Sequence, residues 1–221
     1  MPKLKKHLLP RIKEMLHQEI SAKDADPNSL HVDLSTVQRF NSMDSDSIFI
    51  KGDCMYCHNL GRFNYMTYDV RRSQDVINLG TSHHNIMVLA NDDNSHPFLY
   101  ACVLGIYHVN VIYTGGGSVD YTACRVEFLW VRWFEYNSNK SVMWVDLKLN
   151  PIHFPPMVDE GTFNFVDPRN VLHGCHIIPA FARGKAQING IGLLKLAGDA
   201  GDWSEYHANR YNLFHCFISW C

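Results

Sequence analysis

The sequence has almost no net charge and no long apolar run. Its 20 lysines and arginines are offset by 22 aspartates and glutamates, which leaves a formal net charge of -2 at pH 7. Without an excess of one sign, no global field draws the whole chain to nucleic acid or to an anionic membrane, so any such contact has to be local. A membrane-spanning helix needs about 18 or more consecutive apolar residues, and no such window occurs. The basic N-terminal residues are followed by no apolar h-region, so we also expect no secretory signal.

Cysteines are few and irregularly spaced. Seven occur, an odd number, and several lie inside apolar runs. This pattern favours reduced thiols in an intracellular protein over a disulfide framework. The composition is otherwise that of a globular protein, with 46% hydrophobic and 19% charged residues, and 221 residues are enough to bury a sizeable core.

The centre of the chain is the segment from Cys124 to Tyr136, CRVEFLWVRWFEY. Successive side chains of a strand point to opposite faces, and both sets of alternating residues are largely apolar here. A strand buried on both faces belongs in the interior of a closed barrel or a sandwich. We therefore expect residues 124 to 136 to form an interior strand of an antiparallel β structure.

Residues 1 to 20 repeat an apolar side chain at every fourth position, which predicts a basic amphipathic helix. Pro10 interrupts the repeat and predicts a kink or the start of a second helix. Five cations precede the first acid, Glu14, and this pattern favours a solvated helix face over a nucleic-acid contact. The cations are Lys3, Lys5, Lys6, Arg11 and Lys13.

The rest of the chain divides into segments that differ in composition and in the spacing of their apolar residues. Residues 21 to 45 are polar and predict a linker. Residues 46 to 200 carry short strand patterns separated by glycine, proline and asparagine turns, which favours one antiparallel barrel-like domain over alternating βα units. Within it we expect a hairpin at residues 47 to 58 and a kink at Gly105. Residues 201 to 221 return to helical spacing and predict a capping helix.

Cys54, Cys57 and His58 form C-x-x-C-H, the spacing of c-type haem attachment. With His83 and His84 these residues could supply tetrahedral zinc ligands. The two histidines are adjacent rather than three to five apart, so a hairpin that happens to carry two thiols is favoured and we expect no cofactor. A metal-dependent nuclease or hydrolase with histidine and cysteine ligands remains the alternative function.

Aromatic residues crowd two neighbouring predicted strands. Most are expected to be core, but a minority at a barrel mouth could surround a methylated ammonium group by cation-π attraction. The candidate ligand-binding rings are Tyr100, Tyr107, Trp130, Trp133 and Tyr136. The basic candidates for phosphate or carboxylate contacts are Arg71, Arg72, Arg125 and Arg132.

An ordered series of sequence blocks carries a family resemblance. The blocks are residues 64–75 (NYMTYDVRRSQD), 86–90, 96–101, 105–111, 128–134, 165–168 and 176–181. Together they resemble uncharacterised basidiomycete proteins that are similar to open reading frames accompanying transposons of the Kyakuja-Dileera-Zisupton (KDZ) type. Those proteins carry no C-x-x-C-H at the positions matching 54–58, and their tails run on differently from residues 217–221, which suggests a truncated gene model here.

A second, fold-level resemblance concerns residues 100–106 and 131–134, which are similar to the core of bromo-adjacent homology (BAH) modules, the SH3-like barrels of chromatin proteins. The two resemblances imply a mainly β protein, an antiparallel SH3-like or BAH-like barrel with short helices at the N- and C-terminal ends. They also imply a non-enzymatic binding module of a mobile-element-associated protein, inside the cell and by that role in the nucleus. Its expected partner is a protein or chromatin peptide, with a local nucleic-acid contact and no membrane. A structural fragment of a larger protein is a further alternative.

Overall fold

The computed structural model describes residues 1–24, 44–64, 74–90, 96–115, 121–136, 149–187 and 189–209. The chain divides into two compact units. The first, called the helical unit, comprises Met1–Tyr56 and His108–Glu127. The second, called the sheet unit, comprises Cys57–Tyr107 and Phe128–Cys221.

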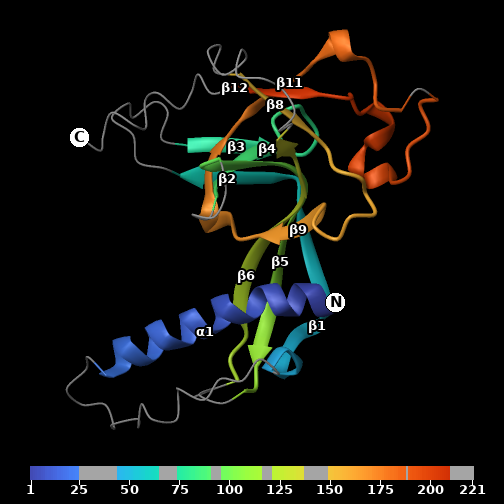
Figure 1. Cartoon of the computed structure of the whole chain (residues 1–221). Coiled ribbons are helices and arrows are strands. Elements are labelled where there is room, and N and C mark those ends of the chain that lie inside the picture. The colour runs from blue at the N-terminus through green and yellow to red at the C-terminus, as the bar shows by residue number, and fades with distance from the viewer. Residues whose placement is uncertain are drawn as a thin grey trace, which may run out of the picture. The chain divides into compact units, whose positions relative to one another are not determined.

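The helical unit is built around α1, Pro2–Asp24 (Figure 1). As predicted, the N-terminal residues form a helix, and it continues across Pro10 as one element. Leu4, Leu8 and Ile12 lie at four-residue intervals and are at most 4% exposed, so one face of α1 is buried. The Arg11 guanidinium donates a hydrogen bond to the main-chain oxygen of Glu127, which ties this face of the unit together.

The remaining described elements of the helical unit are η2 (Asp44–Ser47) and parts of three strands. These strands are β1 (Ile48–His58), β5 (Phe98–Tyr113) and β6 (Cys124–Trp133). Within the unit they bury β-branched residues, which favour the pleated, half-buried surface of a strand. The buried residues are Ile48, Val109, Val111 and Val126.

The hairpin expected at residues 47 to 58 is a wrong prediction. Ile48–His58 forms one strand, β1, which pairs with β5 and does not fold back on itself. Gly52 and Asp53 have positive φ, 68° and 49°, as a turn would require. The local signal is therefore present, but pairing with β5 keeps the strand continuous.

The sheet unit contains antiparallel strands in three sheets (Figure 1). The largest has the order β10-β4-β5-β6-β9, with β1 also paired to β5; the second is β11-β12-β8-β7; the third is β2-β3. The strands not yet bounded are β2 (Leu60–Asn64), β3 (Gln74–Asn78), β4 (Asn85–Leu89), β7 (Glu135–Tyr136), β8 (Leu149–His153), β9 (Phe163–Val166), β10 (Val171–Gly174), β11 (His176–Pro179) and β12 (Tyr206–Asn209). The short 3₁₀ helices are η5 (Pro168–Asn170), η6 (Phe181–Arg183), η7 (Lys195–Ala197) and η8 (Asp199–Gly201).

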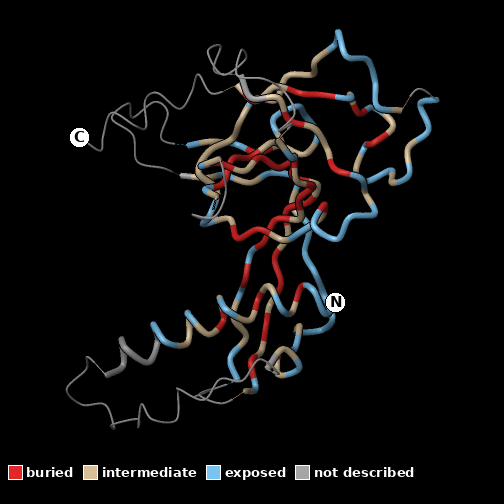
Figure 2. Tube along the Cα trace, viewed as in Figure 1, coloured by how far each residue is buried: buried red, intermediate tan, exposed pale blue. Residues whose placement is uncertain are grey.

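Strands β5 and β6 are buried on both faces within the sheet unit (Figure 2). Side chains on one face of these strands pack with residues of β3 in a core cluster that we call the Leu129 cluster. The Leu129 cluster consists of Ile77, Ile86, Val88, Ala101, Val103, Ile106, Leu129, Val131 and Val166. Side chains on the other face pack with residues of β8 and β12 in a second cluster, which we call the Tyr100 cluster. The Tyr100 cluster consists of Met87, Phe98, Tyr100, Cys102, Phe134, Ile152, Tyr206 and Ala208. The interior strand expected at residues 124 to 136 is confirmed in part, because β6 lies between β5 and β9. Arg125 and Glu127 are exposed, and Glu135–Tyr136 forms β7 in another sheet, so burial on both faces holds only for the segment from Phe128 to Trp133.

An irregularity in β5 coincides with Gly105, where a kink was predicted. Ala101 and Val103 belong to the Leu129 cluster by strict alternation, yet Ile106 joins the same cluster after a three-residue step. The alternation is therefore offset by one residue near Gly105. A Cβ at this position would collide with the ring of Tyr107, so the ring is able to lie over the backbone only because the residue is glycine.

The expected capping helix over residues 201 to 221 is wrong where the structure describes it. Tyr206–Asn209 forms β12, which pairs with β11 on one side and with β8 on the other. Tyr206 and Ala208 are buried while His207 and Asn209 are half-buried, which is the alternation of a strand. Residues 210–221 lie outside the described residues, as do residues 25–43 of the predicted linker.

The fold is thus mainly β, with antiparallel sheets and one N-terminal helix. Among the described residues, no helix combines the length and the apolar character needed to cross a membrane.

Candidate ligand-binding cavity

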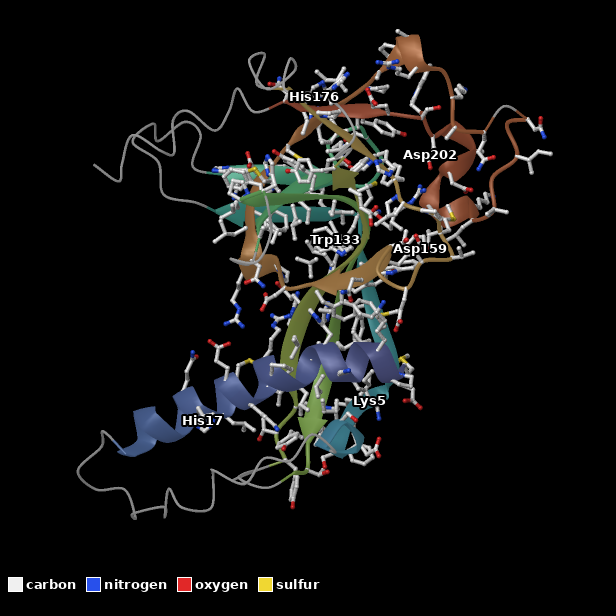
Figure 3. All side chains as sticks on the ribbon, viewed as in Figure 1. Lys5, His17, Trp133, Asp159, His176 and Asp202 are labelled. Atoms are coloured by element: carbon white, nitrogen blue, oxygen red, sulfur yellow. The ribbon has the colours of Figure 1, made fainter. Side chains whose placement is uncertain are left out.

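The aromatic residues singled out from the sequence do not converge on one site. Tyr100 is 2% exposed and packs in the Tyr100 cluster. Trp133, labelled in Figure 3, packs against the Leu129 cluster on the other face of the same sheet. Two rings on opposite faces of a sheet cannot enclose one ligand. Tyr100 and Trp133 therefore do not contribute to one common site.

Tyr136 packs beside Tyr100, and its hydroxyl is engaged within the fold. The hydroxyl donates to the main-chain oxygen of Phe98 at 2.8 Å. The ring stacks on His96 with centroids 4.0 Å apart, and an edge-to-face contact joins it to Tyr100 at 6.1 Å. These contacts give Tyr136 a packing role.

Tyr107 and Trp130 also pack against neighbouring rings. Tyr107 stacks on Phe128 with centroids 5.6 Å apart, and burial raises the pKa of its phenol. Trp130 lies 6.0 Å from the ring of Phe163 in a tilted arrangement. Both contacts are of the kind that aromatic pairs make in protein cores.

The basic candidates separate into different environments. Arg125 pairs with Glu127 at 2.7 Å, but both side chains are more than half exposed, so the pair is a surface ion pair. Arg132 is only 4% exposed. Arg71 and Arg72 lie outside the described residues.

The candidate metal ligands are also spread out. Cys54 and Cys57 are three positions apart on β1 and both are exposed, so alternation directs them to opposite sides of the strand. His83 and His84 lie in the turn before β4, where the His84 ring contacts the main-chain oxygen of Thr81 through Nδ1. In the described part of the chain, no three histidine, cysteine, aspartate or glutamate side chains are close enough to hold a metal ion.

A cavity of about 360 Å³ lies within the sheet unit. It lies between β5 and the segment that carries η7, η8 and β12. Its apolar wall includes Leu104 and Ile177, and its polar groups include Asp202 and, near the exposed surface, Lys195. A volume of this size is at the lower end of small-ligand sites and suits a single side chain or a small molecule.

Three aromatic rings form one side of the cavity. Phe134 and Phe154 are stacked with centroids 4.0 Å apart. Tyr206 meets both edge to face, at 5.5 Å from Phe134 and 5.4 Å from Phe154. Because the rings support each other, they form a rigid wall.

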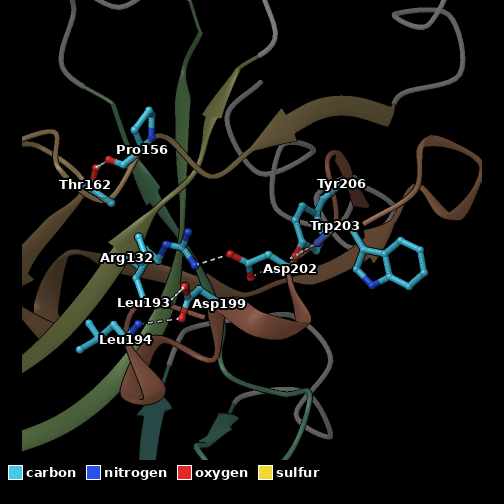
Figure 4. Close-up of polar contacts among 9 residues, drawn as sticks. All are labelled: Arg132, Pro156, Thr162, Leu193, Leu194, Asp199, Asp202, Trp203 and Tyr206. Atoms are coloured by element: carbon cyan, nitrogen blue, oxygen red, sulfur yellow. Dashed lines mark hydrogen bonds and ion pairs between the residues drawn. The ribbon is translucent and has the colours of Figure 1, made fainter. Parts of the chain in front are cut away.

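A buried ion pair lies beside this wall (Figure 4). Arg132 donates from Nη1 to Oδ2 of Asp202 at 2.7 Å, and its guanidinium lies 3.8 Å from the ring centroid of Phe154. The Nε of Arg132 is buried and has no hydrogen-bond partner among the described residues. Arg132 is therefore held by one carboxylate and one ring face, a combination of charge-assisted hydrogen bond and cation-π contact.

Asp202 keeps unused acceptor capacity. Burial raises the pKa of its carboxyl above the ordinary value, although the nearby Arg132 opposes this shift. Among the described residues, the contact given for its second oxygen, Oδ1, is a long one of 3.5 Å from the Tyr206 hydroxyl. That hydroxyl itself accepts a hydrogen bond from the main-chain N–H of Trp203 at 2.9 Å. The carboxylate therefore has acceptor capacity beyond its pair with Arg132, and Asp202 lines the cavity.

Asp199 fixes the segment that carries part of the cavity wall. Its carboxylate accepts hydrogen bonds from the main-chain N–H groups of Leu193 and Leu194 (Figure 4). Burial alone would raise the pKa of Asp199, but these bonds and the charge of Arg132 outweigh it and hold the pKa below the ordinary value. Arg132 thus lies near two carboxylates, and the buried set carries one excess negative charge.

The cysteine beside the cavity is not poised for nucleophilic chemistry. Burial raises the pKa of the Cys102 thiol to about 12, so it is protonated at neutral pH. Burial also raises the pKa of Cys175 far above the ordinary value. The thiolate is the reactive and metal-binding form of cysteine, so neither group supplies it under these conditions.

Among the residues that line this cavity, His84 was a candidate from the sequence, as a metal ligand, whereas Phe154, Asp202 and Tyr206 were not candidates. Of the buried charges beside the cavity, Arg132 was a candidate and Asp199 was not. A signal was available, because an arginine inside an otherwise apolar interior strand requires a buried counter-ion. The sequence does not say which of the 22 acidic residues supplies it.

No protein-family model matches the chain, and neither the curated proteins nor the solved structures contain a match.

Proposed function

We propose that the protein is a non-enzymatic binding module of a mobile-element-associated protein, and that its cavity receives a lysine side chain of a chromatin or other nucleoprotein partner. The observation that carries this proposal is the carboxylate of Asp202, which faces a cavity walled by three aromatic rings. The antiparallel sheets are consistent with a BAH-like barrel, which we include in the proposal.

The charge balance supports a cationic ligand. Asp199 and Asp202 outnumber Arg132 in the buried set, and Oδ1 of Asp202 is weakly occupied. A carboxylate in a desolvated site gains more from an added cation than one in water, because the effective dielectric constant is lower. An ammonium group at Oδ1 would supply the missing charge.

The apolar wall of the cavity favours a ligand whose ammonium group is carried on a long alkyl chain. Lysine buries its methylene groups against apolar surface while its charged head finds a polar partner. Leu104 and Ile177 line the cavity together with the rings of Phe134 and Tyr206. The cavity therefore offers a lysine side chain an apolar wall for its methylene groups and the Asp202 carboxylate for its ammonium group.

The test is a calorimetric titration with lysine-rich histone-tail peptides, set against the same peptides with acetylated lysines. We expect the unmodified or methylated peptides to bind and the acetylated ones to bind at least about tenfold more weakly, because acetylation removes the charge. No heat of binding with any lysine-rich peptide would overturn the proposal.

Lys195 provides a variant that tests the sign of the ligand charge. It lines the cavity and is exposed, so Lys195→Glu should leave the fold intact and tighten a cationic peptide by about two- to fivefold. The matched control is Lys51→Glu, an equal charge change at an exposed residue of β1 that does not line the cavity. Equal effects of the two variants, or weaker binding by Lys195→Glu, would contradict a lysine in this cavity.

A further inference from the structure

The aromatic wall of the cavity in the sheet unit is a closed stack rather than an open cage. Phe134 and Phe154 are stacked with their centroids 4.0 Å apart, so each ring covers one face of the other. The guanidinium of Arg132 lies over Phe154 at 3.8 Å from the ring centroid, and two groups this close cannot share one face. Both faces of Phe154 are therefore occupied within the fold.

Tyr206 lies beside this stack. Its centroid is 5.5 Å from that of Phe134 and 5.4 Å from that of Phe154, with interplanar angles of 71° and 74°. A ring that is almost equally distant from two stacked rings lies at their edges. The three rings therefore contact one another, whereas the cages that bind quaternary ammonium groups turn several ring faces toward one point.

The carboxylate of the cavity sets a different requirement on a ligand. Asp202 lines the cavity, and its Oδ2 accepts a hydrogen bond from Arg132 at 2.7 Å (Figure 4). Its Oδ1 has a long contact of 3.5 Å with the Tyr206 hydroxyl, which also accepts from the main-chain N–H of Trp203. An ionised carboxylate is an acceptor only, so a strong hydrogen bond at Oδ1 requires a ligand that carries a donor hydrogen.

We propose that the cavity selects lysine side chains whose ammonium group keeps at least one N–H, and that it discriminates against trimethyllysine. The selection rests on the proposed function, because it concerns the ligand of the same cavity. Unmodified, monomethylated and dimethylated ammonium groups each have a hydrogen to donate to Oδ1 of Asp202. A trimethylammonium group keeps the positive charge but has no N–H, and the ring stack supplies no cage to compensate for the lost hydrogen bond.

The experiment is a calorimetric titration of the full chain with four versions of one synthetic peptide. The peptide carries a single lysine, which is unmodified, monomethylated, dimethylated or trimethylated. We expect the first three versions to bind with similar affinity and the trimethylated version to bind at least about fivefold more weakly, because a hydrogen bond to a charged group is lost.

The outcomes separate the selection from the proposed function. If the trimethylated peptide binds as tightly as the unmodified one, or more tightly, the selection is overturned while a lysine-binding cavity stands. If none of the four peptides gives a heat of binding, the proposed function is overturned and the selection with it.

Asp202→Asn tests whether the carboxylate makes the selection. The amide is similar in shape but uncharged, so the affinity for the unmodified peptide should fall more than that for the trimethylated peptide, and the ratio between them should shrink. The matched control is Asp159→Asn, at an exposed residue that does not line the cavity, and it should leave the ratio unchanged. A ratio unaltered by Asp202→Asn in a protein with an intact circular dichroism spectrum would overturn the role of Asp202. Should this variant fail to fold without its pair to Arg132, the wild-type peptide series still decides.

Discussion

Strand β6 is buried in two different ways along its length. In the helical unit, Arg125 and Glu127 are exposed while Val126 is buried, so one face of the strand is exposed to solvent and the other is buried. In the sheet unit, Phe128 and Leu129 follow each other and are both fully buried. One-sided burial leaves a surface for charged partners, whereas two-sided burial creates an interior in which an ion pair and a cavity can be built. Each unit therefore suits a different kind of contact.

Truncating a side chain in the interior half of β6 should destabilise the protein far more than truncating one in the half with an exposed face. Phe128 is 0% exposed, stacks on Tyr107 and meets Phe165 edge to face at 5.5 Å. Phe128→Ala should therefore lower the free energy of unfolding by about 4 kcal/mol, through lost apolar burial and a new cavity. Arg125→Ala, on the solvent-exposed face of the same strand, should lower the free energy of unfolding by less than about 1 kcal/mol. Urea denaturation of both variants measures the contrast, and similar costs would show that the two halves are not differently buried.

The second prediction concerns the buried ion pair. Arg132→Met should cost about 3 kcal/mol, because it leaves the carboxylate of Asp202 buried without its partner. Adding Asp202→Leu to that variant should restore much of the loss, since a buried ion pair is often no better than apolar residues of similar volume. The double-mutant cycle, measured by denaturant unfolding, gives the coupling energy. A cycle in which the two single costs simply add would mean that the pair does not act as a unit.

The sequence predicted the elements whose signal is local and periodic. The helix of residues 1 to 20 and the interior strand near residues 124 to 136 follow from spacings of four and two. At Gly52 a turn signal was present, but a long-range pairing decided the outcome. At Tyr206 the aromatic spacing resembled a helix, yet partner strands on both sides imposed a strand. Local patterns therefore give element type reliably only where no distant partner competes.

The cavity could not be assembled from the sequence for a related reason. Arg132 and Asp202 are 70 positions apart, and nothing in the spacing of either residue indicates the other. Alternation places neighbouring rings of one strand on opposite faces, so the candidate rings do not all share one site. Phe134 lies on the cavity side of the sheet, and its ring partners come from β12 and from the residues after β8. Only the sheet topology brings these residues together.

The smallest expected effect, and the sharpest test of the buried charges, is the pH dependence of stability. The pKa of Asp199 is lowered in the folded protein, so its contribution is present above the ordinary carboxyl pKa and is lost as the pH falls through the lowered value. The stability difference between wild type and Asp199→Asn should therefore shrink from pH 7 to pH 3. The pKa of Asp202 is raised, so its ionisation opposes folding, and the difference between wild type and Asp202→Asn should instead grow in favour of the wild type as the pH falls. Thermal unfolding at several pH values measures both trends. If the two stability differences change in the same direction with pH, the pKa values of Asp199 and Asp202 are not shifted in opposite directions.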